Sequence, residues 1–456
     1  MNRKLFIPII IMIMLCAGSC KKDWLDQKRD ISLVVPTSLS DMRQLLRNSI
    51  PQEYECRGIT ELGAGDYYIT TTNYNSLTAQ LEKSGYIWKS DLFAGITYLA
   101  EWDYSYQQVL TANVVLEALD KLSQTTSNQA DYNDVKGEAL FMRARAFYNV
   151  AQVFTKPYEK TSAGSDLGVP LRQTSDINAV STRATLQQTY DQITADLQTA
   201  ASLIKVIPDS RVDPGLAAVS GLLARCYLSM GNYDKALQYS DQSLKTYSKL
   251  INYNTLSKTS TRPFTVLNDE VILPGYVNTS LASLKAGVGR IDSVLYASYA
   301  ADDLRKTLYF LKNTDGTFSF KGQYSGTSLL FGGLATDEMY LIRAECEART
   351  NNLTAALADL NTLMATRFKT GTYTPYTTTD VNAALKTILL ERRKELLLRG
   401  LRWSDLRRLN KDPQFAATLT KVISGTTYTL LPNDPRYTFP IPEYVIKLSG
   451  ITQNTY

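Results

Sequence analysis

Apolar side chains recur at helical spacing in the middle of the chain, and this periodicity constrains the fold more than any other feature. Leu140, Ala144, Phe147, Ala151 and Phe154 follow one another at spacings of three and four residues. That spacing places them on one face of a long amphipathic helix. Because neighbouring helices have to cover such a face, the stripe predicts a core position and not a ligand site.

Other segments predict partners for this helix. One helix is expected from Trp102 through Leu119, and another begins near Thr185-Leu186. Leu216–Leu250 predicts two helices separated at Gly231-Asn232, and this segment resembles a tetratricopeptide repeat, whose small residues let two helices pack closely. Glu338–Arg367 repeats the scheme more loosely. Several hairpins of this kind predict an α-solenoid.

Two long segments interrupt the helical pattern. Glu53–Ala100 and Asn252–Gly333 are rich in Gly, Thr, Tyr and Asn, and Asp315-Gly316 predicts a hairpin turn between two short strands. Long irregular insertions in a regular scaffold commonly carry function. The expected fold is therefore mostly α: tetratricopeptide-like hairpins in a solenoid, with long irregular loop insertions and a few short β-hairpins. We expect ligand contacts in the insertions.

The N-terminus predicts export. Arg3 and Lys4 precede the apolar run Leu5–Leu15, and Ala17-Gly18-Ser19 then leads to Cys20. The run is shorter than the roughly 20 residues that a membrane-spanning helix needs, so residues 1–19 read as a signal peptide that is removed. The small residues before Cys20 resemble the lipobox of bacterial lipoproteins. The alternative is an ordinary secretory signal in which this cysteine is incidental.

The lipobox resemblance implies that Cys20 carries a diacylglycerol and an amide-linked acyl chain such as palmitate. More than one acyl chain gives stable membrane anchoring. Residues 20–37 are then a lipidated tether, and residues 38–456 form a single domain. We expect an N-terminal helical part over about 38–250 and a C-terminal part over about 251–456.

Composition excludes several function classes. The chain contains no histidine, so Ser-His-Asp and Cys-His nucleophile systems and His-bearing zinc sites cannot be built from it. A net charge of +5 over 456 residues does not indicate a nucleic-acid partner. Cys56, Cys226 and Cys346 are widely spaced and form neither a disulfide framework nor a metal knuckle. No cofactor and no metal is expected.

The C-terminal third carries the most specific pattern in the chain. Its blocks are Ile388–Leu396, Gly400–Arg408, Phe439–Pro442 and Gln453-Asn454. Further matches are Cys20–Asp26, Gly137–Ala139, Leu222–Tyr227 and Tyr340–Glu345. Taken together, these blocks resemble the SusD/RagB family of outer-membrane nutrient-uptake lipoproteins of Bacteroidetes-type bacteria. The resemblance spans the whole mature chain.

The resemblance implies a function and a partner. Such proteins cap a TonB-dependent SusC-like β-barrel as a hinged lid and hold an oligosaccharide, or another nutrient, at the barrel mouth without catalysis. It also implies a lipid anchor in the outer membrane, facing the cell exterior. The residues after Cys20 do not themselves indicate an outward-facing location, because Lys21-Lys22 and not acidic residues follow Cys20 directly. The sequence does not name the nutrient.

One pair of carboxylates invites an enzymatic interpretation. Glu391 and Glu395 lie four residues apart on one helix face, at about the separation that retaining glycosidases use. The cations expected around them are Arg392, Arg393, Lys394, Arg399 and Arg402. These charges would keep both acids ionised and leave no general acid, so we expect no enzyme activity. The resemblance assigns a structural role to Glu391, Arg392, Glu395, Gly400, Arg402, Trp403, Asp405 and Arg408.

Ligand contacts are predicted from aromatic and polar side chains in the insertions. An aromatic face packs against the C–H groups of a sugar ring, and neighbouring polar groups bind its hydroxyls. The candidates in the first insertion are Asp66, Tyr67, Tyr68, Asn73, Tyr74, Tyr86, Trp88 and Lys89. Those in the second are Tyr276, Tyr296 and Tyr324. The alternative for each is that it packs the insertion against the scaffold.

Two other functions remain open on the sequence alone. A scaffold lipoprotein would bind protein partners through its helical repeats and show no affinity for small ligands. A carboxylate-dependent glycosidase would show turnover of an oligosaccharide.

Overall fold

The computed structural model describes residues 36–47, 53–55, 57–277 and 281–454. The predicted signal peptide, the lipidation site Cys20 and nearly all of the predicted tether lie outside these residues, as does Cys56. Among the helices that are described, none combines the length and the apolar character needed to cross a bilayer.

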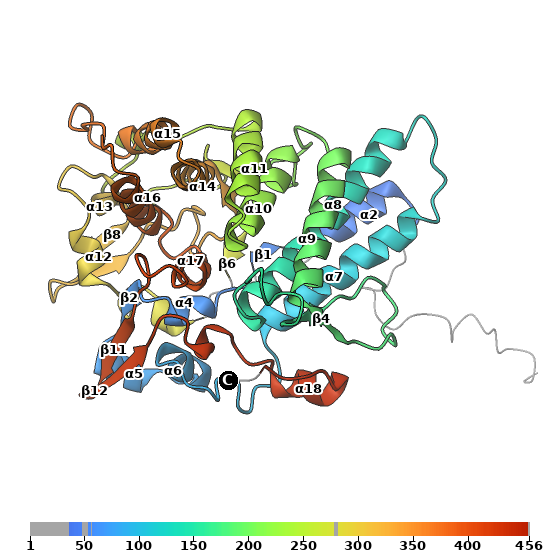
Figure 1. Ribbon diagram of the computed structural model, residues 1–456, viewed down its shortest axis with the longest axis horizontal. Coiled ribbons are helices and arrows are strands. Elements are labelled where there is room, and N and C mark those ends of the chain that lie inside the picture. Colours follow the sequence, from blue (N-terminus) through green and yellow to red (C-terminus); the bar gives the residue numbers. More distant parts are fainter. Residues whose placement is uncertain (1–35, 48–52, 56, 278–280, 455–456) are drawn as a thin grey trace, which may run out of the picture.

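A row of long helices forms one half of the molecule (Figure 1). These are α7 (Ala100–Leu119), α8 (Gln129–Phe154), α9 (Leu186–Leu203), α10 (Leu216–Ser229) and α11 (Tyr233–Thr246). Each packs against the next one along the chain, and the short α2 (Leu39–Arg47) covers α7 and α8. The short strands β3 (Leu167–Pro170) and β4 (Arg183–Thr185) pair between α8 and α9.

Helix α8 lies at the centre of this half. The predicted apolar stripe is buried, but so is every other residue from Gly137 to Phe154, including Arg143 and Asn149. The guanidinium of Arg143 donates two hydrogen bonds of 2.8 Å to Asp196 of α9. The prediction of a single buried face was too narrow, because α7, α9 and a C-terminal segment of the chain enclose α8. The amide of Phe439 in that segment donates to the carbonyl of Val153 at 3.0 Å.

The two predicted tetratricopeptide-like hairpins are confirmed. Helices α10 and α11 meet at Gly231, whose φ of +72° suits glycine, and the Asn232 side chain caps α11 by accepting from the amide of Lys235. The second hairpin consists of α14 (Thr336–Arg349) and α15 (Leu353–Ala365). Helix α16 (Val381–Glu395) packs on α14, and α14 also contacts α11, so the rows of helices are continuous.

The two insertions form short elements that pair with each other. The first contains β1 (Tyr54–Glu55), α4 (Thr60–Gly63), β2 (Tyr67–Tyr68), α5 (Thr71–Ser76) and α6 (Gln80–Tyr86). The second contains β5 (Val271–Leu273), β6 (Tyr276–Val277), β7 (Arg290–Ile291), α12 (Ser293–Ala297), α13 (Arg305–Leu308), β8 (Phe310–Lys312) and β9 (Phe318–Phe320). Strand β1 pairs with β6 and β2 with β7, while β10 (Leu334–Ala335) pairs with β5. The hairpin predicted around Asp315-Gly316 is confirmed as β8–β9.

The C-terminal segment binds the two halves together. It contains α17 (Arg402–Leu409), the hairpin of β11 (Leu419–Ile423) and β12 (Thr426–Leu430), and α18 (Glu443–Ser449). One hydrophobic core extends from Ile59 to Ile451 and includes Trp403, and a second fills the space between the insertions. The prediction of a mostly helical, tetratricopeptide-like fold with irregular insertions is confirmed.

Candidate functional site

Several predicted ligand residues of the first insertion are buried. Tyr67, Tyr86 and Trp88 enclose the ammonium of Lys421, which lies 3.4 Å from the ring centre of Tyr86 and 5.3 Å from the other two. The Nζ atom of Lys421 also donates to the carbonyl of Leu62 at 2.8 Å. These rings therefore hold the β11–β12 hairpin against the insertion, which is the packing alternative stated for them.

The remaining candidates of this insertion have more varied surroundings. Asp66 is buried and accepts from Arg393 at 2.8 Å. Asn73 and Tyr74 are half-buried, and each donates to a main-chain carbonyl of the insertions. Tyr68 and Lys89 are exposed. A ligand contact stays a prediction for all of them, and only the exposed side chains offer surface without rearrangement.

The three candidates of the second insertion are not gathered in one place. Tyr324 is buried beneath the guanidinium of Arg399, 3.9 Å from the ring centre. Tyr296 stacks on Phe318 at 3.7 Å between ring centres. Tyr276 is half-buried on β6, directly opposite Tyr54 of β1.

Tyr276 belongs to a group of tyrosines that we call the tyrosine surface: Tyr54, Tyr98, Tyr104 and Tyr276. The rings of Tyr54 and Tyr104 stack with centres 5.9 Å apart, and Tyr98 meets Tyr104 edge-on at 5.8 Å. Tyr98 is 52% exposed. Burial, with contributions from Glu53 and Tyr54, raises the pKa of Tyr276. Strand β1, strand β6 and the start of α7 thus bring aromatic faces and phenolic hydroxyls together, which suits the ring of a sugar.

Sequence reasoning missed three members of the tyrosine surface. Tyr54 and Tyr98 lie in the insertion that was expected to carry ligand contacts, but near its two ends. Tyr104 belongs to α7, which was expected to be part of the helical scaffold. No spacing in the sequence connects these residues, because the pairing of β1 with β6 places Tyr54 beside Tyr276, and ring contacts across α7 add Tyr104 and Tyr98. The usable signal was the clustering of tyrosines immediately before and after the start of α7.

The paired glutamates of α16 are ion-pair partners. Arg305 donates to Glu391 at 2.6 Å and to Glu395 at 2.8 Å, and Arg367 donates to Glu395 at 2.8 Å. Burial acts to raise the pKa of Glu395, but the charges of Arg367 and Arg305 outweigh it and lower that pKa to about 2. A carboxyl group in this state is not available as a general acid near neutral pH.

The source of these cations differs from the expectation. Of the basic residues expected around the glutamates, only Lys394 contacts one of them, with its Nζ atom 2.7 Å from Glu391. The others bind acids elsewhere: Arg392 binds Asp405, Arg393 binds Asp66 and Arg399 binds Asp337, while Arg402 lies 3.8 Å from Asp66. The reason is geometric. Arg392 and Arg393 follow Glu391 directly and point away from the face that it shares with Glu395, and Arg399 and Arg402 lie beyond the end of α16, whereas Lys394 lies three residues after Glu391 and reaches it.

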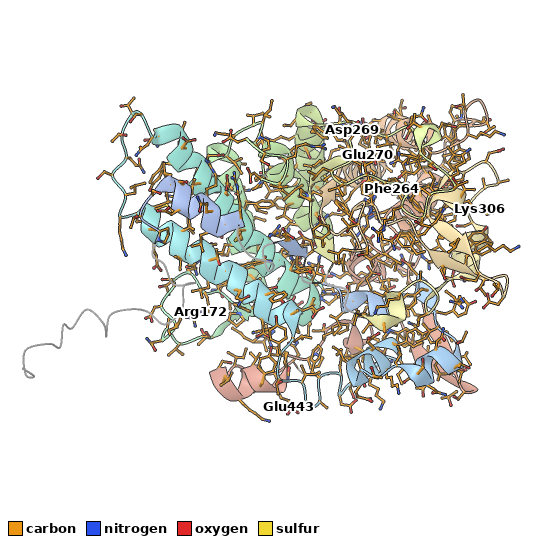
Figure 2. All side chains as sticks on the ribbon, turned by 180° about the vertical axis from the view of Figure 1, so that it is seen from behind. Arg172, Phe264, Asp269, Glu270, Lys306 and Glu443 are labelled. Atoms are coloured by element: carbon orange, nitrogen blue, oxygen red, sulfur yellow. The ribbon has the colours of Figure 1, made fainter. Side chains whose placement is uncertain are left out.

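Three buried carboxylates have the spacing of a cation site. Glu270, Asp337 and Glu395 each place an oxygen within 4.8 Å of the others; Glu270 is labelled in Figure 2. Arginines already occupy this space. Arg367 bridges Glu270 and Glu395 at 2.9 and 2.8 Å, and Arg399 donates to Asp337 at 3.0 Å. The arrangement is a buried network of ion pairs.

The most specific block of the C-terminal sequence connects α14, α16 and α17. Asp405 accepts from Arg392 and Arg408 at 2.9 Å each, and Arg408 also donates to Glu345 of α14 at 2.6 and 2.8 Å. Gly400 has a φ of +71°, and its amide donates to Glu61 at 2.6 Å. Trp403 is buried. These contacts join the scaffold to the first insertion.

Comparison with known proteins identifies the family. A family model described as starch-binding and associating with the outer membrane matches residues 23–228, and the SusD family model matches residues 336–456. The chain belongs to the SusD/RagB family. It is 28% identical over 140 residues to the SusD-like protein P2 of Formosa agariphila, a match that covers 30% of this chain and only 25% of that relative.

Solved structures share the fold of this SusD-family protein. A putative sugar binding protein of Bacteroides vulgatus superposes with a TM-score of 0.72 at 20% identity, covering 92% of this chain and 99% of the other. A SusD superfamily protein of Bacteroides thetaiotaomicron superposes with a TM-score of 0.70 at 20% identity, covering 92% and 100% of the two chains. At this identity, the likeness concerns the fold.

Proposed function

We propose that this SusD-family protein is a non-catalytic, surface-exposed lipoprotein that captures an oligosaccharide and delivers it to a SusC-like TonB-dependent barrel. Family membership supports carbohydrate binding and an outer-membrane location. The observation that carries the proposal is the tyrosine surface, where stacked and partly exposed rings gather on paired strands and a helix.

The geometry supports binding without turnover. Glu391 and Glu395, the two carboxylates at glycosidase-like spacing, form ion pairs with Arg305 and Arg367. Aromatic faces of tyrosine bind sugar rings by stacking while their hydroxyls bind sugar hydroxyls. Cys20 would fix the body to the outer leaflet through its lipid. Tethering the captured glycan at the barrel mouth raises its effective concentration there.

Calorimetric titration with a panel of oligosaccharides tests the binding role. We expect at least one glycan to bind wild-type protein, and we expect the Tyr98→Ala, Tyr104→Ala double variant to lose about tenfold or more in affinity, since each stacking contact contributes about 1 kcal/mol. Tyr68→Ala removes a different exposed tyrosine in the first insertion. Equal losses in both variants would contradict the assignment to the tyrosine surface, and product formation would contradict a non-catalytic role.

Purification from membranes tests the partner. The protein, solubilised in detergent and captured by an affinity tag, should carry a β-barrel of the TonB-dependent class with it. Recovery of other proteins in place of a barrel, together with no glycan affinity, would favour the scaffold function instead.

A further inference from the structure

A cavity of about 820 Å³ lies apart from the tyrosine surface, within the roughly 300–1,000 Å³ range of ligand sites. It opens where the loop after α8, the end of α17 and the segment before α18 meet. No member of the tyrosine surface lines it. Ligand cavities are commonly apolar, whereas this lining includes six charged side chains and three asparagines, so the cavity offers hydrogen bonds to a polar ligand.

The carboxylates that line the cavity are all neutralised locally. Each has its own cation, and the pairs are Lys156–Asp166 at 2.8 Å, Lys411–Glu159 at 3.1 Å and Arg436–Asp434 at 2.7 Å. The charges cancel within each pair, so the net charge of the lining is set by the charged side chains that have no such partner.

The group that remains is Arg407, which lines the cavity and is only 4% exposed. Within the described part of the chain, no carboxylate lies within ion-pair distance of its guanidinium. Its two terminal nitrogens donate to the main-chain oxygens of Gln152 and Thr155 at the end of α8. The negative end of a helix dipole carries only about half a charge, so a positive excess persists. Burial lowers the pKa of Arg407 to about 10, which leaves the guanidinium protonated near neutral pH.

Asn410 places a donor in the same lining. Its Oδ1 accepts from the amide of Ala417 at 3.0 Å, but its Nδ2 is buried and completes no hydrogen bond among the described residues. The hydroxyl of Tyr437, also in the lining, is buried in the same condition. Burial raises the pKa of Tyr437, and the interaction of its hydroxyl with the Asn410 side chain opposes that rise, so these two buried polar groups face each other. The Nε atom of Arg407 is buried and has no hydrogen-bond partner among the described residues, and a buried donor of this kind is costly, which favours a ligand that supplies an acceptor.

We propose that this cavity binds the carboxylate-bearing unit of an acidic glycan. The paired ions and amides of the lining bind its hydroxyls, and the positive charge of Arg407, with the amide of Asn410, attracts its carboxylate. The cavity is then a second binding site, separate from the tyrosine surface. The proposal depends on the proposed function in one respect, that the ligand is a glycan.

A matched pair of sugars tests the charge preference directly. Saturation-transfer NMR titrations of the full chain compare sodium D-glucuronate with D-glucose, which differ by the carboxylate. We expect glucuronate to bind at least about tenfold more tightly, and the preference to shrink as salt is raised because ions screen the attraction. Equal affinities, or no binding of either sugar, would overturn the proposal.

Asn410→Asp tests the location. The substitution keeps the oxygen that accepts from Ala417 and replaces the amide nitrogen with a negative charge, three residues from Arg407 and thus on the same side of the chain at the end of α17. Glucuronate affinity should fall about tenfold or more while glucose affinity stays unchanged. Asn178→Asp, on an exposed loop, makes the same change in net charge and should have no effect.

The two sites are separable in these experiments. Tyr98→Ala, which alters only the tyrosine surface, should leave the glucuronate preference intact. If Asn410→Asp folds with an unchanged thermal midpoint and retains full glucuronate affinity, the cavity assignment is wrong, whatever the tyrosine variants show. If the tyrosine variants leave glycan binding unchanged while Asn410→Asp abolishes glucuronate binding, the proposed function of the tyrosine surface is wrong and the cavity assignment holds.

Discussion

Glu395→Gln is the substitution that most directly probes the buried ion-pair network. Glu395 is fully buried and accepts from both Arg305 and Arg367 at 2.8 Å. Removing one member of a buried pair costs about 3–5 kcal/mol, because it leaves the other charge without compensation. Arg305 keeps Asp303 and Arg367 keeps Glu270. We therefore expect a loss near the lower limit, about 3 kcal/mol in the free energy of unfolding.

The depressed pKa of Glu395 reflects the same contacts with Arg305 and Arg367 and makes their contribution depend on pH. Its shift from the ordinary value of 4.5 to about 2 corresponds to about 3 kcal/mol of pH-linked stability. Because the pKa is depressed in the folded protein, this stability is present above pH 4.5 and is lost as the pH falls toward 2. The difference between wild type and Glu395→Gln should therefore shrink on acidification.

Urea denaturation followed by circular dichroism measures both effects. Glu443→Gln is the matched control, because Glu443 is exposed and its pair with Lys447 at 3.3 Å should contribute less than about 1 kcal/mol. A Glu395→Gln protein within about 1 kcal/mol of wild type near neutral pH, or a difference that stays constant on acidification, would refute the reasoning.

Three further predictions concern other parts of the chain. Gly400→Ala should destabilise by about 1 kcal/mol or more in urea denaturation because of the positive φ, whereas Gly164→Ala, whose added Cβ meets nothing within 4 Å, should not. Burial lowers the pKa of Lys421, so stability should rise with pH below the ordinary value of 10.5, and Lys421→Met should remove that slope; an unchanged slope would assign it to another group. Cys20→Ala should abolish labelling by a fatty-acid analogue, and retained label would contradict lipidation at this residue.

The helical scaffold could be predicted from the sequence because its signals are local. The break at Gly231-Asn232 and the apolar spacing of α8 depend only on residues a few positions apart. What the pattern could not show was that α8 is enclosed on all sides. Arg143 is buried between α7 and α9, where it donates to Asn113 and Asp196, and the C-terminal segment, almost 300 residues later in the chain, contacts the end of α8 at Val153.

The charged network and the tyrosine surface depend on contacts that no local pattern encodes. Arg305 comes from α13 and Arg367 lies just after the end of α15, and nothing near them in sequence pairs them with Glu395. Likewise, the sequence left open whether Tyr67, Tyr86 and Trp88 contact a ligand or pack the insertion, and the position of Lys421 between them shows that they pack. Sequence reasoning found the kind of residue that the insertions use, but it could not separate the aromatic rings that face the solvent from those that pack the interior.

The position of the tyrosine surface has a consequence for selectivity. Tyr54 is fixed by the pairing of β1 with β6, and its carbonyl accepts from the side chain of Gln108 on α7 at 3.1 Å. Tyr104 is part of α7 itself. Rings that are held in place before a ligand arrives lose little conformational entropy on binding, so stacking energy is retained as affinity. A pre-formed surface of this kind favours ligands whose ring spacing matches the spacing of the tyrosines. Its selectivity then follows from shape and does not depend on the charge in the separate cavity.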